Sequence, residues 1–506
     1  MTPPIPIRAI VGRFGLAFTR RALEGVMQAH PFAFCADIST GELPPFAGIP
    51  AAQQEFFARS EIRKAHYAGV DWNGIAPLDE ELILQMRECE AVFMAVVTRL
   101  EDKHAVPYLT RKLWYLRHLQ FWNDYLTRRR INLYLSAWTP HEIPDIVIYY
   151  LCRQRGIPVL FFDITTLRDV ACASRDVRHV TPQIGERYRV LLAERPTGAP
   201  ESVPLREPFA SYERDLLSVA GKPPVLMSIP LPTHGYHLRT LALYRPFALF
   251  LPALRILFTP AGWARAWEAL QRWRAVRRTE HFYNAHASVP DLTKPFVYFP
   301  LHSQPELSTV PLGGVYADQI LAARLLNATL PDGVLLYVKE HPRRGGWLSR
   351  NTEYYRDFLE LEKVRLIPKD VDTFILRERC TAVATITGSA GFEALFRGKQ
   401  VFLFGSWFYQ YARGVFPIRT ARDCAEAVRA VFERREAPTP WSTHLYLKAM
   451  EETCMMGVVD RWFLLVTGKS EEEHVKALKN AIGKELAALQ DEITGVASAP
   501  SWKEIS

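Results

Sequence analysis

Cysteine is scarce in this sequence and shows no paired spacing. Seven cysteines are scattered over 506 residues, and none forms a CxxC pair. That pattern argues against a disulfide framework and against a zinc site, and it favours a reducing compartment. Long hydrophobic runs are lacking too. The longest membrane-like stretch, residues 247–258, contains Pro252 and Arg255 and is too short to span a bilayer.

The beginning of the sequence lacks the features of a secretory signal. Residues 1–21 include Pro3 and Pro4 and have no clean apolar run before a small-residue cleavage site. Together with the missing membrane span, this predicts a cytoplasmic protein, or one bound peripherally to the inner face of the plasma membrane.

Several catalytic signatures are also absent. The sequence has no GxSxG, HExxH or GxxxxGK[ST] motif, which argues against hydrolase, zinc-protease and P-loop NTPase functions. The acidic run at Asp79, Glu80 and Glu81 is typical of the first turn of a helix rather than of a metal site. We therefore expect no required metal ion and no cofactor.

The net charge is mild and the composition is ordinary. Lys and Arg number 62 and Asp and Glu 54, which gives +8, while hydrophobic residues make up 48% and charged residues 23%. These values exclude a disordered or fibrous chain and predict two or three globular domains. A charge this dilute does not indicate nucleic-acid binding, but it allows affinity for an anionic ligand or surface.

The first half of the sequence predicts helices followed by a parallel strand unit. The first 130 residues are expected to be mostly helical, with helices at 78–104 and 112–130. A strand at 131–137, a helix at 144–156 and a second strand at 157–163 then form a β-α-β unit. Such a unit implies a parallel sheet.

The second half shows a longer alternation of strands and helices. Strands are predicted at 294–301, 333–341, 363–368, 381–387 and 399–405, each followed by a helical stretch. This alternation predicts an α/β fold with an open, doubly wound sheet. The simplest architecture is two Rossmann-like domains facing across a cleft, with helical additions at both ends of the chain.

The expected domain boundaries follow from these patterns. We place a helical and Rossmann-like domain at 1–185, a connecting or inserted basic helical segment at 186–290, a second Rossmann-like domain at 291–435, and C-terminal helices with a tail at 436–506. Ligands of open α/β sheets bind beyond the carboxyl ends of the strands. The loops that follow strands are therefore the candidates for chemistry.

The loop at 301–314 follows the first strand of the second half. His302, Gln304 and Glu306 lie just after that strand. Gly313 precedes the next helix, where close backbone approach and free N–H groups suit an anionic ligand. The alternative is a long loop whose polar residues cap neighbouring elements.

The next strand ends abruptly in basic residues. The candidates there are Lys339, His341, Pro342, Arg343 and Arg344. Lysine and arginine supply positive charge, and a histidine can donate to a phosphate oxygen or act as an acid toward a leaving group. This corner predicts phosphate binding, and a solvated turn with a hydrogen-bonded histidine is the alternative.

A third loop runs from small residues into a helix. It consists of Thr387, Gly388, Ser389 and Ala390, and Glu393 lies one turn further on. We expect Ser389 to cap the helix, the free N–H groups to bind an anion, and Glu393 to reach a ribose hydroxyl. Plain capping and close helix–strand packing are the alternative. Three such loops at one sheet predict a nucleotide or nucleotide-sugar site.

A histidine and a carboxylate follow a strand in the first half. His141 and Glu142 lie just before the proline that opens the next helix. Either side chain could take the proton from an acceptor hydroxyl. The alternative is that Glu142 only complements the helix dipole. Asp163, at the end of the following strand, is the second candidate base.

A basic, tryptophan-rich stretch connects the two halves. Residues 261–278 hold three tryptophans and five arginines, and the apolar stretch 247–258 precedes them. The combined segment 247–278 suits an anionic membrane surface. The alternative is a helix packed at the domain junction with solvated arginines.

Three stretches of the second half form recognisable motifs: YFPLHSQPELSTVPLGGVYADQ (298–319), YVKEHP (337–342) and TITGSAGFEALFRGKQVFLFG (385–405). They resemble the bacterial capsule and surface polysaccharide biosynthesis proteins, a family that includes the Kdo transferases of capsule assembly. WTPHEIPDIVIYYLCRQRGIPVLFF (138–162) resembles the N-terminal half of the same proteins. The resemblance implies a GT-B-like fold, in which two Rossmann-like domains hold a nucleotide-sugar between them.

The resemblance also implies roles for single residues. The family's His-Pro pair corresponds to His341 and Pro342 and is associated with the nucleotide's phosphate. Its serine-containing loop corresponds to 387–390, again near phosphate, with Glu393 as a ribose partner. The His-Pro pair is shared with transferases that use CMP-sugars, which favours a CMP-linked donor such as CMP-Kdo. It also occurs in teichoic-acid polyol-phosphate polymerases.

The expected function is therefore a glycosyltransferase of capsule or other surface polysaccharide biosynthesis. Its partners would be a nucleotide-sugar donor and a glycan or lipid-linked acceptor, with no nucleic acid. A nucleotide-sugar epimerase, a polyol-phosphate transferase and a non-enzymatic membrane-peripheral assembly protein are the alternatives.

Overall fold

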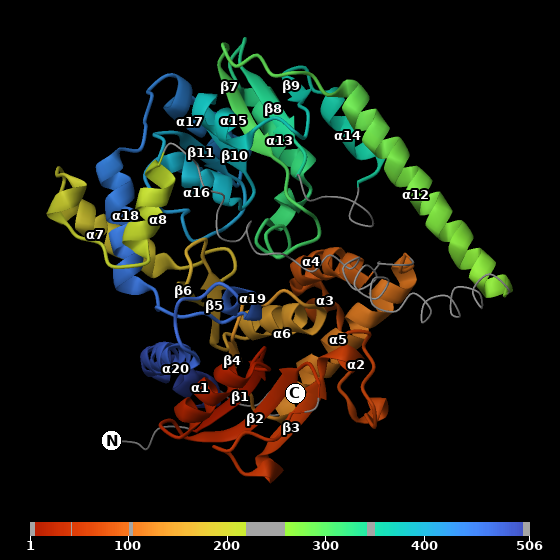
Figure 1. The fold of residues 1–506 in the computed structure, drawn as a ribbon. Helices are drawn as coiled ribbons and strands as arrows, with labels where there is room; N and C mark the ends of the chain where they lie inside the picture. The colour runs from red at the N-terminus through yellow and green to blue at the C-terminus, as the bar shows by residue number, and fades with distance from the viewer. Residues whose placement is uncertain (1–5, 42, 101–104, 219–258, 342–349, 499–506) are drawn as a thin grey trace, which may run out of the picture.

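The computed structural model describes residues 6–41, 43–100, 105–218, 259–341 and 350–498. Figure 1 shows two sheet-containing halves, one above the other, with a long helix projecting from the side. The apolar stretch at 247–258, together with Pro342, Arg343 and Arg344, lies outside the described residues.

The N-terminal half is built on a six-stranded sheet with the order β3-β2-β1-β4-β5-β6. Its strands are β1 (Ile7–Gly12), β2 (Phe32–Ser39), β3 (Gln54–Ala58), β4 (Leu133–Ser136), β5 (Val159–Ile164) and β6 (Ala171–Ser174). The first five strands run parallel, and β6 is antiparallel to β5. The predicted strand–helix–strand unit is confirmed as β4, α6 and β5.

The prediction that the first 130 residues are mostly helical is wrong for residues 7–58. That segment contains β1, β2 and β3, with α1 (Ala17–Met27) between the first two strands. Short apolar runs such as IRAIVG do not distinguish a buried strand from a buried helix by periodicity alone. The parallel pairing of β1 with β2 and with the distant β4 identifies this segment as a strand.

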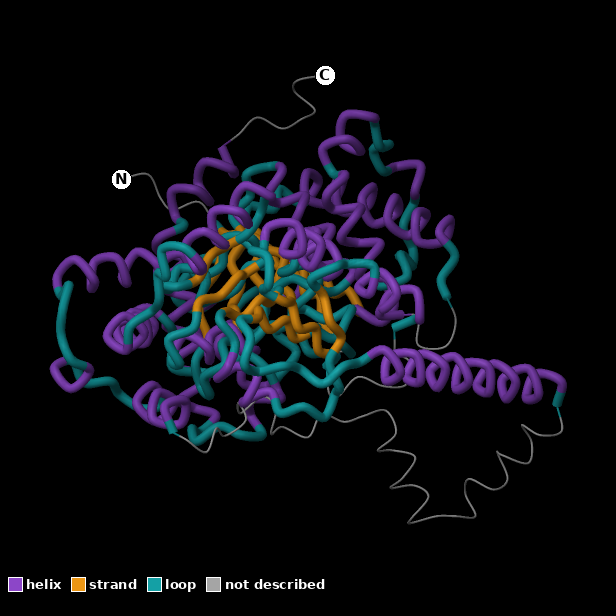
Figure 2. The backbone as a smooth tube through the Cα atoms, turned by 90° about the horizontal axis from the view of Figure 1, so that it is seen from above, coloured by secondary structure: helices purple, strands orange, loops and turns teal. Residues whose placement is uncertain are grey.

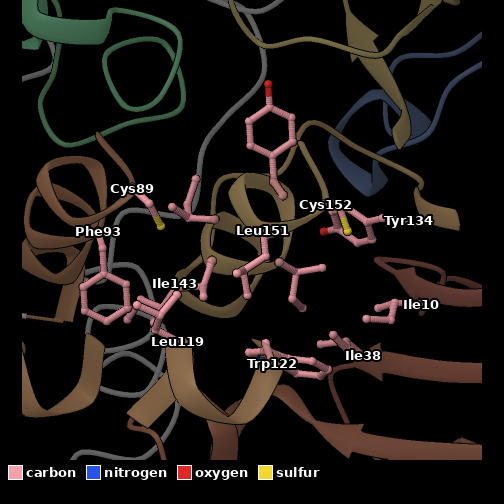
Figure 3. Packing of buried hydrophobic residues seen from close by; sticks show 14 of the residues in the cluster. Ile10, Ile38, Cys89, Phe93, Leu119, Trp122, Tyr134, Ile143, Leu151 and Cys152 are labelled. Carbon is pink, nitrogen blue, oxygen red and sulfur yellow. The ribbon is translucent and has the colours of Figure 1, made fainter. Parts of the chain in front are cut away.

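Helices cover this sheet and complete its core. They are α2 (Arg59–Ile62), α3 (Glu80–Gln85), α4 (Arg87–Val97), α5 (Tyr108–Arg128) and α6 (Ile143–Gln154), with short 3-10 turns at Ala51–Gln53, Trp72–Gly74 and Thr98–Leu100. Figure 3 shows Phe93, Leu119 and Trp122 of the helices in one cluster with Ile10 and Ile38 of the sheet. The predicted helix at 78–104 is divided at Met86, whereas the one at 112–130 is confirmed as α5.

The C-terminal half holds a fully parallel sheet with the order β12-β11-β10-β7-β8-β9. Its strands are β7 (Phe296–Pro300), β8 (Leu335–Lys339), β9 (Val364–Leu366), β10 (Ala382–Thr385), β11 (Gln400–Leu403) and β12 (Val415–Pro417). The five predicted strands are confirmed. The edge strand β12 was missed, because three residues ending in proline carry almost no periodic signal.

Helices alternate with these strands. They are α13 (Gln319–Thr329), α14 (Thr352–Leu359), α15 (Thr373–Arg379), α16 (Ser389–Leu395) and α17 (Ala421–Phe432), and a 3-10 turn spans Gly314–Ala317. Numbered within each half, both sheets have the strand order 3-2-1-4-5-6 of a doubly wound fold. The prediction of two Rossmann-like domains is therefore confirmed.

The remaining helices flank the two halves. They are α7 (Pro182–Glu194), α8 (Phe209–Leu217), α12 (Pro260–His286), α18 (Pro440–Thr453), α19 (Arg461–Leu464), α20 (Glu471–Ala488) and α21 (Gln490–Ser498), with a 3-10 turn at Pro200–Ser202. After α18 packs on α7, the chain returns to the N-terminal half, where α20 packs on α1 (Figure 1). Leu478, Ile482 and Leu486 of α20 join the same buried cluster as Val11 and Leu23.

One disulfide is present, although the scattered cysteines argued against a disulfide framework and favoured a reducing compartment. Cys172 of β6 is bonded to Cys454, which follows α18, and the neighbouring residues Ala171 and Met455 form a β-bridge. The two cysteines are separated by 282 residues, so spacing in the sequence could not pair them. The other five cysteines are buried thiols.

Candidate functional site

Each sheet has a switch point where the strand order reverses and where ligands of such folds bind. In the N-terminal half it lies between β1 and β4, and in the C-terminal half between β7 and β10. The loops after these four strands contain Arg13, His141, His302 and Gly388. The candidate residues of both halves therefore follow the strands that flank the two switch points.

His302 lies at the centre of the C-terminal switch point. Its backbone N–H donates to Gln319 Oε1 at 2.8 Å, and Gln319 Nε2 donates back to its carbonyl oxygen at 3.1 Å. The ring Nε2 lies 3.0 Å from Thr385 Oγ1, at the end of β10. Burial, with His341 and Arg350 nearby, lowers the pKa of His302 to about 3, so its ring is neutral near pH 7.

The first and third predicted loops meet at His302. A Cβ added to Gly388 would lie 2.6 Å from Thr385 Oγ1 and 3.2 Å from His302 Cε1, so only glycine fits against the ring without displacement. The Thr387 hydroxyl donates to the Ser308 carbonyl oxygen at 2.6 Å. Because Gly388 has no side chain, the main chain at the start of α16 lies directly against the His302 ring.

The structure corrects one detail of that loop. Gly388, not Ser389, is the N-cap residue of α16, and no side chain caps the helix. Ser389 and Ala390 form its first turn and are half-buried. The N-terminal N–H groups of α16 thus lie beside the His302 ring without a capping side chain of their own.

The second predicted loop, which contains Glu340 and His341, is linked to His302 through Arg350. The His341 N–H donates to Glu340 Oε1 at 2.7 Å. Arg350 joins the two loops, because it pairs with Glu340 Oε2 at 3.0 Å and donates to the His302 carbonyl oxygen at 2.6 Å. The imidazole of His341 also acts electrostatically on His302.

The structure directs the side chain of Lys339 away from the predicted phosphate corner. The Lys339 ammonium is buried and donates to the Val371 carbonyl oxygen and, at 2.9 Å, to Thr373 Oγ1. It holds the loop before α15 and is not available to a phosphate. The nearby Asp370 and Asp372 resemble a metal motif, but Asp372 Oδ1 accepts from the Phe374 N–H at 2.7 Å and caps α15.

Glu393 is likewise committed to a structural contact. Its carboxylate is only 5% exposed and forms an ion pair with Arg377. Burial raises the pKa of Glu393, and Arg377 opposes that rise. A carboxylate so enclosed does not reach a ribose hydroxyl in this structure, so the prediction of a ribose contact is not supported.

The remaining predicted residues of the first loop are Gln304, Glu306 and Gly313. Gln304 is half-buried, with its Oε1 3.5 Å from Gln319 Nε2. Glu306 is exposed, and its carbonyl oxygen accepts from Thr309 and Val310. Gly313 is tightly packed: an added Cβ would lie 2.5 Å from the Thr309 carbonyl oxygen.

In the N-terminal half, His141 has a defined orientation and tautomer. Its Nδ1 lies 2.6 Å from the Thr139 carbonyl oxygen, which can only accept, so Nδ1 carries the proton and Nε2 keeps its lone pair. Burial lowers the pKa of His141 well below its usual value, and Arg13 and Arg99 lower it further. The neutral ring is therefore a proton acceptor through Nε2.

The two other candidate bases are held by neighbours. Glu142 is 39% exposed in its side chain, and its Oε1 lies 3.2 Å from Arg13 Nη2. Asp163 is buried and accepts a hydrogen bond from the Thr139 hydroxyl, while burial raises the pKa of Asp163 to about 6. Asp163 therefore acts on His141 indirectly: it holds the hydroxyl of Thr139, and the carbonyl oxygen of Thr139 orients the His141 ring.

Sequence reasoning missed a set of charges beneath this loop. The Asp145 carboxylate is fully buried on α6 and pairs with Arg13 Nε at 3.3 Å and Arg59 Nη1 at 2.8 Å. Arg13 adopts a positive φ of 69° and also lies over the Trp138 ring, 5.7 Å from its centroid. The only signal was the short GRFG turn (12–15) after a strand that was itself not predicted.

Arg99 connects the two halves, and sequence reasoning missed it as well. Its guanidinium donates to the His141 carbonyl oxygen in the N-terminal half. It also donates to the Pro305 carbonyl oxygen at 3.3 Å and the Val310 carbonyl oxygen at 2.7 Å in the C-terminal half. Burial lowers the pKa of Arg99 to about 10, yet it stays charged near pH 7. The base loop and the His302 loop are thus joined through one side chain.

The described ranges contain no group of three His, Cys, Asp or Glu side chains that could hold a metal ion. The absence of a required metal and of a cofactor remains a prediction, and so do the site assignments that the structure does not correct.

Residues 315–429 match the model of a protein family described as capsule polysaccharide biosynthesis protein. The predicted resemblance is confirmed over these residues. They run from the turn before α13 to α17 and include the start of α16, beside His302. No curated protein matches the chain.

Solved structures with similar folds belong to several enzymes. KpsC from Thermosulfurimonas dismutans is matched twice. Its beta Kdo 2,4 transferase matches at 15% identity over 63% of this chain and 79% of that one, with a TM-score of 0.25. Its beta Kdo 2,7 transferase matches at 13% identity over 76% and 95%, with a TM-score of 0.28. A UDP-GlcNAc 2-epimerase from Methanocaldococcus jannaschii matches at 8% identity over 88% and 100%, with a TM-score of 0.24. Scores this low carry no conclusion about activity.

Among the residues that the structure describes, no helix is both long enough and apolar enough to cross a membrane.

Proposed function

We propose that the protein is a glycosyltransferase of capsule or other surface polysaccharide assembly. It would transfer a sugar from a nucleotide-activated donor, favoured to be CMP-linked as in CMP-Kdo, to a glycan or lipid-linked acceptor. The observation that carries this proposal is the junction at Arg99, which joins a loop with a neutral, oriented His141 to the loop that holds His302. The capsule family match lies in the half that contains His302 and supports the same function.

The donor would bind at the C-terminal switch point. The first N–H groups of α16, after Gly388, would be donors for a phosphate oxygen, as at the starts of helices that bind nucleotides. His302 and His341 lie beside that position and are the candidate side chains for the nucleotide. Lys339 and Glu393 are left out because their side chains are committed to other contacts.

The acceptor would bind on the side of His141. In the proposed step, Nε2 of His141 takes the proton from the acceptor hydroxyl, and the resulting oxygen attacks the anomeric carbon of the donor sugar. The new C–O bond forms as the bond from that carbon to the nucleotide phosphate breaks. The nucleotide leaves with both electrons of that bond and is stabilised by the N–H groups at the start of α16.

A nucleotide panel tests the donor assignment. Thermal unfolding of the chain is measured with CMP, UDP, GDP and CDP-polyols at equal concentrations. A CMP-linked donor predicts a rise in Tm with CMP that exceeds the rise with each other nucleotide, because a ligand that binds only the folded state stabilises it. An equal or larger shift with UDP or a CDP-polyol would contradict the CMP assignment.

Product analysis distinguishes transfer from isomerisation. Incubation with the donor alone should leave the sugar unchanged, because the proposed reaction needs an acceptor hydroxyl. Conversion of the nucleotide-sugar to a new isomer without acceptor would favour an epimerase instead.

A further inference from the structure

The helix α12 exposes aromatic and basic side chains along one face. It spans 27 residues, Pro260–His286, and projects from the side of the molecule (Figures 1 and 2). At about 1.5 Å per residue it is roughly 40 Å long. Trp263, Trp267 and Trp273 are 62%, 59% and 57% exposed, and Leu270 is 37% exposed.

The spacing of these side chains places them on a common surface. Trp263, Trp267 and Leu270 are separated by four and three residues, so they lie on the same side of the helix. Arg274 and Arg278 continue that line at four-residue steps. Both arginines are exposed.

The C-terminal part of α12 is anchored to the body of the protein. Thr279 and Tyr283 are buried, and the Tyr283 hydroxyl donates to the Ile367 carbonyl oxygen at 2.6 Å. In contrast, residues 266–275 are exposed without a break. A soluble protein rarely leaves such large apolar side chains together in water, so this part of the helix requires a partner.

We infer that this face of α12 docks on an anionic membrane surface. Within Pro260–His286 five arginines outnumber the two glutamates, Glu268 and Glu280, which complements a negatively charged lipid surface. Tryptophan is suited to the headgroup region, where its ring is apolar and its N–H can still bond. Arg277 lies over the Trp273 ring, 5.5 Å from its centroid, so charge and aromatic surface lie next to each other.

The helix would lie in the plane of the membrane surface. It is not apolar enough to cross a bilayer, and a basic helix with an aromatic face instead rests at the boundary between headgroups and acyl chains. This orientation would hold the C-terminal half, to which α12 is anchored at Tyr283, close to the lipid surface. The inference stands without the proposed transferase activity, because it concerns only the surface of α12.

Vesicle sedimentation of the full chain tests this inference. The chain should sediment with vesicles of phosphatidylcholine mixed with phosphatidylglycerol and much less with phosphatidylcholine alone, and salt should weaken the binding. Replacing Trp263, Trp267 and Trp273 together by Gln should lower the partition coefficient by at least about tenfold, because their apolar surface no longer leaves water. Replacing Arg278 by Gln should lower it by about fivefold.

A matched variant guards against a general loss of surface hydrophobicity. Val190 of α7 and Leu217 of α8 are 44% and 48% exposed, and replacing both by Gln should leave vesicle binding unchanged. Thermal unfolding should be unaltered in both variants, since the changed side chains are exposed. No sedimentation with anionic vesicles, or equal binding by the tryptophan variant, would overturn the inference. A parent dimer that the tryptophan variant converts to a monomer would assign the face to a second copy instead.

The measurement is independent of catalysis. Vesicle binding is read without nucleotide or acceptor, so a chain that binds vesicles but no nucleotide would contradict only the proposed transferase function. A chain that binds nucleotide but no vesicles would contradict only the docking of α12.

Discussion

The two switch points share one topology but are built from different chemistry. In the N-terminal half, buried ion pairs between Asp145 and the guanidinium groups of Arg13 and Arg59 support the loop that carries His141. In the C-terminal half a buried ion pair, Arg350 with Glu340, also holds the His302 main chain, but the ring itself contacts a hydroxyl and packs against a glycine. Charge fixes the geometry of a reacting side chain, whereas small residues admit a ligand to the main chain.

This difference predicts that substitutions in the two halves will alter different measured quantities. Changes around His141 should alter turnover, because the proposed proton acceptor lies in that half. Changes around Gly388 should alter nucleotide binding, because the proposed donor site lies in that half. Changes at Arg99, which contacts both loops, should alter the stability of the whole arrangement.

The largest effect is expected for His141→Gln. The variant removes the Nε2 lone pair that would accept the proton, so kcat should fall by about 10²–10⁴-fold, the usual contribution of a general base. The rise in Tm caused by nucleotide should stay the same. Glu142→Gln is the matched control and should lower kcat far less. If Glu142→Gln were the more damaging change, the carboxylate would be the base.

Arg99→Met is the next largest change. Three carbonyl oxygens from two loops lose their donor, so the free energy of unfolding should fall by about 2–4 kcal/mol, measured by urea unfolding. Arg99→Lys keeps the charge but not the fork of donors and should restore part of the loss. The surface arginine Arg128, paired with Asp124 on α5, is a control whose change to Met should cost little. Equal losses at both positions would refute the role of Arg99 as a junction.

Asp163 predicts a pH dependence of stability. Burial raises its pKa in the folded protein to about 6, from an ordinary value of 3.8, so the folded state keeps the proton to a higher pH. Its ionisation therefore reduces the free energy of unfolding as the pH rises through this window, by at most about 3 kcal/mol. Asp163→Asn removes this ionisation. As the pH rises from 3.8 to about 6, the parent should therefore lose stability relative to the variant. A pH-independent difference would show that Asp163 titrates normally.

The smallest effect is expected for Gly388→Ala. The new Cβ would press on Thr385 Oγ1 and the His302 ring, which should displace the start of α16. Nucleotide affinity, measured by titration, should fall by about tenfold, the equivalent of roughly 1.4 kcal/mol, within the usual cost of overpacking. Gly468 is the control position for the same substitution, because an added Cβ there would meet no atom within 4 Å. Unchanged affinity would place the nucleotide away from Gly388.

Much of the fold was predictable because alternating strands and helices leave a strong local pattern. Every predicted strand from 294 to 405 was found, and so was the unit at 131–163. The pattern failed for β1, β2 and β3, since their short apolar runs resemble buried helix segments. It also could not show that α20 packs on α1, because that contact depends on residues more than four hundred positions apart.

The candidate site was predictable by position but not by side-chain direction. Strand ends identified the loops of His141, His302 and Gly388, and the structure joins them. Lys339 and Glu393 had the right charges in the right places, but burial turned both toward partners inside the protein. Arg99 lies in no motif, and its role depends on two loops that meet only in the folded chain.

The return of α20 to the first half has a consequence for the order of events during synthesis. Val11 and Leu23 leave the ribosome early, but Leu478 and Ile482, which complete their buried cluster, are made almost last. One buried cluster of the second half, built from residues 283–431, contains no residue of the first half and can form while the first half still exposes apolar surface. A chain that stops before α20 should therefore become a substrate for chaperones and proteases, with the later-made sheet folded and the earlier-made one incomplete.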